Sequence, residues 1–435
     1  MVDSFYYILI SIVLISAVLA WIKSGTIINP TVIYNLWWGF FLFLSSLNLV
    51  GIRLPSMSTY YIFLLGMSMF SLGSITFLSS KRLEKNYYHK KREYKVSIKF
   101  KLFHIYQIIV FFLLVQLNFY TLKMLKNLDP SSFRGLVFSD QGVFGDKLII
   151  FALFVKSAIY IGLFITIAGI LLNKIPKKYI IIPMLNIILF SLGTMGRIPI
   201  FIAILSSSLG ILYLFSITRI KIKPKHVIIF LLPIGFIIFM SFLRQTKYSS
   251  SLFMLIKNYF VWYFTGAFTA FDYFINNLDP GVDYDYSIMR GFFAGIEEVL
   301  APLLRRILPS LHKINDSFHS FTGQFKNLGG AATHHSSHYT MYFAFYRDAG
   351  IYGVIIYSYI IGVINSLLFN KFRTTHSLTS FTVLLLSMYL SLMGIMRWEF
   401  RYIWSNVTLL GILFFTQKFV LIRKSKKLQL LDGTI

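Results

Sequence analysis

The 435-residue chain contains no cysteine and few charged residues for its length. The lack of cysteine excludes disulfide bonds, cysteine-ligated zinc and thiol nucleophiles. Only 13% of the residues are charged, whereas soluble domains average about 25%. Because 56% of the residues are hydrophobic, the chain cannot cover an ordinary aqueous surface. The composition therefore indicates an integral membrane protein.

Several motifs of soluble enzymes are also missing. The chain has no Walker loop, no dinucleotide fingerprint and no Ser-His-Asp order. The formal net charge of +26 would suit nucleic acid, but in so apolar a chain the charge is first tested against the two sides of a membrane. The first apolar run lacks a basic flank and a small-residue cleavage site, so we expect no cleavable signal peptide.

Long apolar runs predict an all-α, polytopic transmembrane helical bundle. A helix needs roughly 20 mostly apolar residues to cross about 30 Å of hydrocarbon. About eleven runs approach this length, and the sixth is short. They cover residues 5–22, 31–50, 59–79, 102–122, 148–172, 179–194, 198–217, 226–243, 351–369, 380–396 and 402–422.

Basic residues predict the orientation. The segment 81–101 carries nine Lys and Arg, and the positive-inside bias makes it cytoplasmic. The N-terminus is then extracytoplasmic and the C-terminus cytoplasmic. Three regions follow, namely an N-terminal bundle of about eight spans (1–243), a large extracytoplasmic loop (244–350), and a C-terminal bundle of about three spans with a basic tail (351–435).

One apolar segment leaves the number of membrane spans open. Residues 252–275 are apolar enough to form a twelfth span, but a crossing there would move the basic C-terminal tail to the outside. We therefore expect a re-entrant or interfacial helix, with aromatic residues at the headgroup boundary.

Arginine gathers in the segments expected outside, against the positive-inside trend. Arg offers a planar fork that binds phosphate with two hydrogen bonds, whereas Lys acts as a point charge. The pattern indicates recognition of a phosphate or acidic group, and ordinary ion pairing with the outer acids is the alternative. These residues are Arg53, Arg134, Arg197, Arg244, Arg290, Arg305, Arg306, Arg347, Arg397 and Arg401.

Two cations stand out by position. Arg197 follows Gly193-Thr194-Met195-Gly196, a tight turn between two expected spans, and Arg244 at the end of the next span could reach the same space. Lys156 lies inside the fifth expected span, where a charge is a functional candidate by default. Its alternative is snorkelling from the outer half of the membrane.

A histidine cluster precedes the ninth expected span. His334, His335 and His338 are three of the nine His in the chain, and neutral His suits a general base near pH 7. A metal site at His334 and His338 lacks the H-E-x-x-H pattern, and a solvated His-rich turn is the third alternative. Arg347 and Asp348 follow ten residues later.

The chain resembles the Wzy-type oligosaccharide repeat-unit polymerases of bacterial surface polysaccharide pathways. The resemblance rests on the Gly196-Arg197 turn, the large outer loop, and the run Tyr346-Arg347-Asp348-Ala349-Gly350-Ile351-Tyr352-Gly353, with an aromatic residue, an acid and two spaced glycines. The related O-antigen ligases have a His about ten residues before an acid, and His338 and Asp348 are similar to that pair. His335 is the alternative histidine of the pair.

The resemblance implies a GT-C-like glycosyltransferase in the bacterial inner membrane, acting on its outer face. It would join undecaprenyl-diphosphate-linked glycans, donor and acceptor, without a cofactor, a metal or nucleic acid. Membrane lipid would surround the protein, and a chain-length regulator protein is a possible further partner. The rival functions are an O-antigen ligase and a lipid-linked glycan flippase or transporter.

The resemblance and the charges together suggest a role for each candidate residue. A base takes the proton of the acceptor hydroxyl, and cations stabilise the leaving diphosphate. The base is His338, or else His335, and Asp348 orients it. The diphosphate is held by Arg197, Arg244 and Arg347, with Arg134 and Arg401 in second rank.

Overall fold

A computed structural model describes ten stretches of the chain. They are residues 2–79, 100–128, 133, 148–218, 261–276, 287, 289–307, 326–329, 334–335 and 339–416. Within them the chain is helical, apart from one antiparallel pair of two-residue strands, β1 (Lys326–Asn327) and β2 (His334–His335). The expected all-α class is confirmed.

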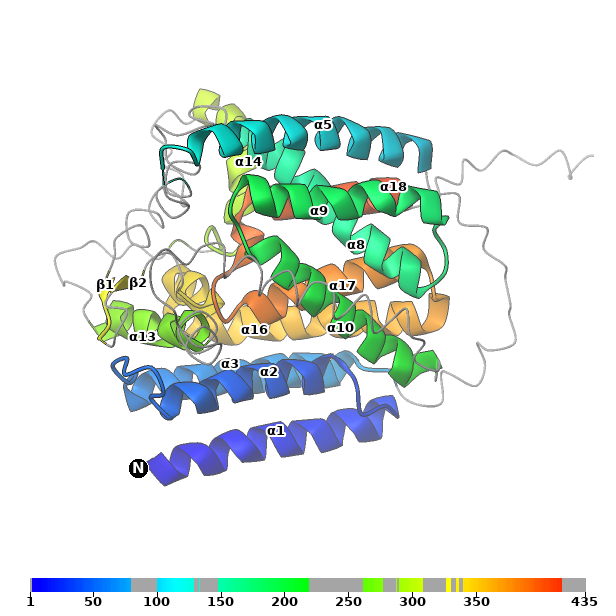
Figure 1. The fold of residues 1–435 in the computed structure, drawn as a ribbon. Coiled ribbons are helices and arrows are strands. Elements are labelled where there is room, and N and C mark those ends of the chain that lie inside the picture. Colours follow the sequence, from blue (N-terminus) through cyan, green and yellow to red (C-terminus); the bar gives the residue numbers. More distant parts are fainter. Residues whose placement is uncertain are drawn as a thin grey trace, which may run out of the picture.

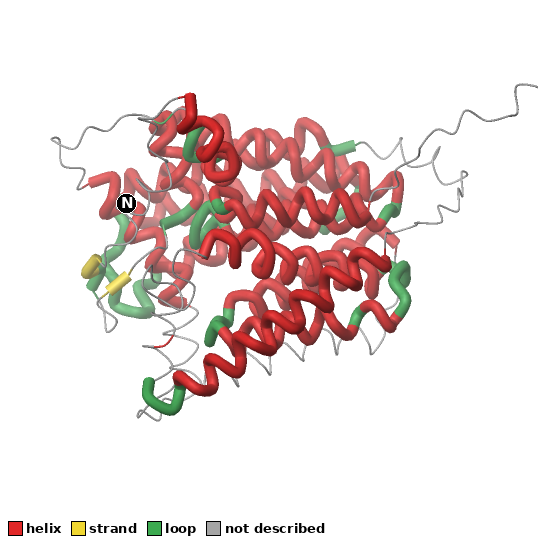
Figure 2. The backbone as a smooth tube through the Cα atoms, turned by 90° about the horizontal axis from the view of Figure 1, so that it is seen from above, coloured by secondary structure: helices red, strands yellow, loops and turns green. Residues whose placement is uncertain are grey.

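Most helices run roughly parallel or antiparallel to one another and form one bundle, crossed obliquely by α8 and α10 (Figures 1 and 2). The helices are α1 (Val2–Ser24), α2 (Pro30–Ser46), α3 (Met57–Phe77), α5 (Phe100–Met124), α7 (Leu148–Phe151), the π-helix η2 (Ala152–Lys156), α8 (Ser157–Leu171), the 3₁₀-helix η3 (Lys177–Tyr179), α9 (Ile181–Gly193), α10 (Ile198–Thr218), α13 (Trp262–Asn276), α14 (Ala294–Ile307), α16 (Met341–Thr375), α17 (Leu378–Met393), the 3₁₀-helix η5 (Glu399–Arg401) and α18 (Ile403–Thr416).

Six helices of the described chain are long and apolar enough to cross a membrane, judged by length and composition. Each expected span except 226–243, which lies outside the described residues, coincides with a helix. Three of these helices, α9, α17 and α18, are apolar but shorter. Several apolar helices could therefore span a membrane, and the number of eleven crossings stays a prediction.

The bundle has two ends, which we name by the position of the N-terminus. The connections 47–56, 194–197 and 394–402 lie at the N-terminal end, together with β1 and β2 (Figure 1). The connections 25–29, 172–180 and 376–377 lie at the opposite end. Helix α3 ends and helix α5 begins at that opposite end.

Helix α16 is fixed by close packing on α3. A Cβ added to Gly73 would lie 2.2 Å from the carbonyl oxygen of Tyr359, and one added to Gly362 would lie 2.1 Å from that of Phe70. Glycine is required because the two backbones are in direct contact. The hydroxyls of Tyr34 and Tyr342 also hydrogen-bond across the bundle at 3.0 Å. The glycine contacts hold the part of α16 after residue 350 against α3, and the Tyr34–Tyr342 hydrogen bond holds its first turn.

Helix α13 packs against α2 and α3 at the N-terminal end of the bundle. Phe264 stacks on Phe41 of α2 with ring centroids 4.3 Å apart. Asp272, near the other end of α13, accepts hydrogen bonds from Ser56 N at 2.9 Å and Thr59 Oγ1 at 2.7 Å. Its carboxylate thus caps the N-terminus of α3, where negative charge is favourable. Residues 219–260 lie outside the described part, so the choice between a re-entrant and a spanning helix stays a prediction.

Candidate active site

Helix α16 is broken within its third turn. Ala349 (φ −157°, ψ 32°) and Gly350 (φ 59°, ψ −141°) leave the helical conformation, and the positive φ of Gly350 favours glycine. Gly353 lets the two halves meet, because an added Cβ would lie 2.0 Å from the carbonyl oxygen of Phe345. Both glycines of the run 346–353 are therefore explained by backbone geometry. The expected span began at 351, where the second half begins.

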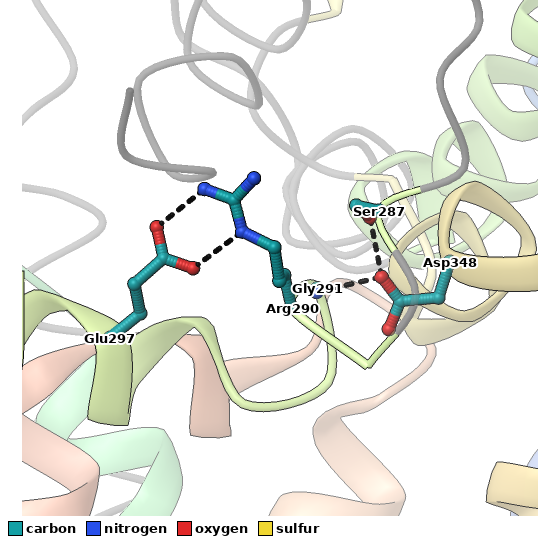
Figure 3. Close-up of polar contacts among 5 residues, drawn as sticks. All are labelled: Ser287, Arg290, Gly291, Glu297 and Asp348. Atoms are coloured by element: carbon teal, nitrogen blue, oxygen red, sulfur yellow. Dashed lines mark hydrogen bonds and ion pairs between the residues drawn. The ribbon is translucent and has the colours of Figure 1, made fainter. Parts of the chain in front are cut away.

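The carboxylate of Asp348 sits at this break and holds a distant segment of the chain. It is fully buried and accepts hydrogen bonds from Ser287 Oγ at 2.5 Å and Gly291 N at 2.7 Å (Figure 3). It also accepts one from Phe292 N at 2.8 Å. The amide of Ser287 also donates to the carbonyl of Arg347 at 3.3 Å. Both carboxylate oxygens are engaged, which makes Asp348 the anchor of residues 287–292.

The other side of this segment is tied to the connection between α17 and α18. Trp398 Nε1 donates to the carbonyl oxygen of Phe292 at 2.9 Å, and the two rings lie 5.1 Å apart. Arg290 forms a two-bond ion pair with Glu297 of α14, at 2.9 and 3.0 Å (Figure 3). The hydrogen bonds that Arg290 donates to the Glu297 carboxylate raise the pKa of Arg290. Residues 287–297 therefore join the break in α16 to residues 394–402.

Two arginines of that connection meet on one aromatic ring. Arg397 and Arg401 place their guanidinium carbons 5.0 and 4.8 Å from the centre of the Tyr402 ring. Arg401 Nη2 donates to Tyr402 Oη at 2.7 Å, and Arg397 Nε donates to Glu399 Oε1 at 2.8 Å. Burial lowers the pKa of Arg397, but the neighbouring Glu399 carboxylate outweighs it and raises that pKa overall. The guanidinium is therefore charged at physiological pH.

Lys156 reaches the same ring from another helix. Its ammonium lies 4.5 Å from the centre of the Trp404 ring and 5.8 Å from that of Tyr402. Lys156 is the last residue of the π-helix η2, and Ser157 Oγ donates both to Ala152 O at 3.0 Å and to Trp404 O at 3.3 Å. Single π-turns inside α-helices are frequent at functional sites. We call Lys156, Arg397, Glu399, Arg401 and Tyr402 the Tyr402 cluster.

Arg197 lies in the expected tight turn at the same end of the bundle. Met195 adopts a positive φ of 49°, and Gly196 N donates to Ser191 O at 2.9 Å. The carbonyl of Arg197 accepts from Phe201 N at 3.1 Å, so Arg197 stands at the start of α10 and is half-buried. A helix N-terminus and a guanidinium both favour an anion.

The structure describes half of the expected site residues. Arg197, Arg347, Asp348 and Arg401 all lie at the N-terminal end of the bundle. The backbone of His335 pairs with Lys326 in the small sheet, and its side chain is not described. The other expected residues lie outside the described part, and they are Arg134, Arg244 and His338. No group of three metal-ligating side chains occurs among the residues that the structure describes.

Sequence reasoning missed the partners that build this region. Ser287, Gly291 and Trp398 carry no motif, because two of them act through the backbone or an indole N–H. Glu399 had a detectable signal, since it is an acid two residues after Arg397 at the end of an apolar run. A buried acid beside an arginine at a span end indicates an ion pair.

No protein family, curated protein or solved structure matches the chain. The resemblance to repeat-unit polymerases therefore rests on the residues and the architecture given above. The activity of the protein is accordingly a proposal, made below from the site.

Replacing Asp348 should loosen this end of the bundle. Asp348→Ala leaves the buried amides of Gly291 and Phe292 without an acceptor, at a cost of about 1–3 kcal/mol for each. We expect a melting temperature several degrees lower in detergent and faster proteolysis near residue 290. Glu297→Gln is the matched control, since it weakens a partly exposed pair worth at most about 1 kcal/mol. Equal melting temperatures for Asp348→Ala and the wild type would contradict the anchoring role.

Proposed function

We propose that the protein joins lipid-diphosphate-linked oligosaccharide repeat units into a long polysaccharide on the outer face of a bacterial inner membrane. One observation carries the proposal. Four described arginines of the connections and helix starts, Arg197, Arg347, Arg397 and Arg401, share the N-terminal end of the bundle. The Lys-rich connection 172–180 belongs to the opposite end.

Arginine at the ends of apolar helices is suited to a lipid diphosphate. The lipid tail stays in the membrane, and the diphosphate reaches the level of the helix ends. Arg197 stands at the N-terminus of α10, so helix dipole and guanidinium act on an anion together. Arg347 precedes the break in α16, and Arg244 and Arg134 complete the diphosphate set in this proposal.

The proposed reaction is a glycosyl transfer. An acceptor hydroxyl attacks the anomeric carbon of the donor, the bond from that carbon to the diphosphate breaks, and the lipid diphosphate leaves. A base accepts the hydroxyl proton, and His338 or His335 serves in this role. Arginines stabilise the charge that develops on the leaving diphosphate. We assign Asp348 a positioning role, because its oxygens already anchor residues 287–292.

The proposed orientation places the N-terminal end outside the cytoplasm. The chain has no native cysteine, so single cysteines report accessibility without background. Leu54→Cys marks the N-terminal end, where Leu54 is 45% exposed, and Ile27→Cys marks the opposite end, where Ile27 is 66% exposed. In intact spheroplasts a membrane-impermeant maleimide should label position 54 and spare position 27, and lysis should permit labelling of both. The reverse pattern would overturn the orientation.

Removing Arg197 should abolish chain growth. A deletion strain complemented with Arg197→Ala should display surface glycans of a single repeat unit on a gel, because one phosphate ligand at the start of α10 is lost. Arg53→Ala is the matched control, an exposed arginine at the same end of the bundle, and should give the wild-type ladder of lengths. Membrane levels of both variants are compared by immunoblot.

Two outcomes of this experiment count against the proposal. A normal ladder in Arg197→Ala removes that residue from the mechanism. A deletion strain that accumulates long polymer on its lipid carrier identifies a ligase instead of a polymerase.

A further inference from the structure

The Tyr402 cluster holds more positive than negative charge in a largely buried place. Three cations, Lys156, Arg397 and Arg401, surround the Tyr402 ring. Glu399 is buried and pairs with Arg397. The other carboxylate of the region, that of Glu298 in α14, accepts the backbone amide of Ile403 at 3.1 Å and so caps α18.

Lys156 is the cation with the fewest anionic contacts. Among the described residues no carboxylate lies within ion-pair distance of its ammonium, and its printed neighbours are the faces of Tyr402 and Trp404. A half-buried cation of this kind is costly in a membrane protein unless an anion joins it. The aromatic faces offset part of that cost.

An apolar groove of about 370 Å³ opens beside the same π-helix. It lies between α5 and α7–η2, and its walls include Ile109 and Leu113 of α5 and Phe151, Phe154 and Val155 of α7 and η2. Val155 is the residue before Lys156. Ile109 and Phe154 are more than half exposed on the face of the bundle, where the hydrocarbon chains of lipids would lie. One short helical segment thus carries Val155, which lines the lipid-facing groove, and the next residue, Lys156, which belongs to the Tyr402 cluster.

We propose that this region binds one long-chain lipid phosphate, with its phosphate at the Tyr402 cluster and its chain in the groove between α5 and η2. The proposal goes beyond the diphosphate site at Arg197 and Arg347, since it gives the protein a second place for a lipid-linked anion. It rests on the proposed function in one respect only, the choice of a polyisoprenyl chain. An enzyme that joins two lipid-linked units must hold two lipid anions at once.

The test measures binding of undecaprenyl phosphate to the purified full-length protein in detergent, by native mass spectrometry. Lys156→Met removes the charge but keeps an apolar side chain of similar length, and should weaken binding at least about tenfold, as expected for loss of a charge-assisted contact. Lys123→Met, an exposed lysine at the end of α5, is the matched control and should bind like the wild type.

The groove is tested separately by Ile109→Trp. This substitution on the exposed face of α5 fills the groove and leaves the cations in place. It should weaken binding of undecaprenyl phosphate and leave inorganic pyrophosphate unaffected. Because Ile109 is on the surface, the variant should fold even if Lys156→Met does not.

Four results would overturn the inference. These are wild-type affinity in Lys156→Met, wild-type affinity in Ile109→Trp, pyrophosphate binding as strong as that of the lipid phosphate, and phosphatidylglycerol binding as strong as that of undecaprenyl phosphate. The last two would indicate a plain phosphate site or an ordinary headgroup site. The assay contains no glycan, so a protein that binds the lipid but does not extend glycans contradicts the proposed function and leaves this inference standing.

Discussion

The anchoring of residues 287–292 by the Asp348 carboxylate is the interaction on which the N-terminal end of the bundle depends. A helix that breaks inside an apolar bundle exposes backbone groups, and each must find a partner because water is absent. Asp348 supplies two backbone amides and one hydroxyl of a distant segment with an acceptor. That segment in turn holds Trp398, and with it the connection that carries Arg397 and Arg401.

The two ends of the bundle differ in the kind of positive charge they carry. The opposite end carries mainly lysine, which is sufficient for orientation in the membrane because only a point charge is needed. The N-terminal end carries arginine, whose fork binds phosphate in a fixed geometry and remains ionised in a partly dry site. Here the carboxylates of Glu399 and Glu298 already have local partners, an arginine and a helix N-terminus. Among the described residues no carboxylate lies within ion-pair distance of Lys156, so an external anion is a natural complement for that cation.

The sequence predicted the features that have a local signal. Apolar runs located the helices, the glycines around 193–196 predicted the tight turn, and the expected start at 351 coincides with the break in α16. Partners far apart in sequence carried no such signal. Asp348 meets residues 56 to 61 positions away, and Asp272 caps a helix that begins more than 200 positions earlier. The π-turn before Ser157 likewise carried no signal in the sequence, because a run of apolar residues is compatible with either kind of helix.

We propose that this chain by itself lengthens lipid-linked glycans. The decisive experiment mixes the purified protein, in liposomes, with lipid-linked repeat units extracted from the deletion strain, and separates the lipid-linked products by size. We expect products of two or more repeat units, with release of one lipid diphosphate for each bond formed, in the absence of nucleotide sugar. Recovery of single repeat units alone, from protein that is folded and inserted, would contradict it.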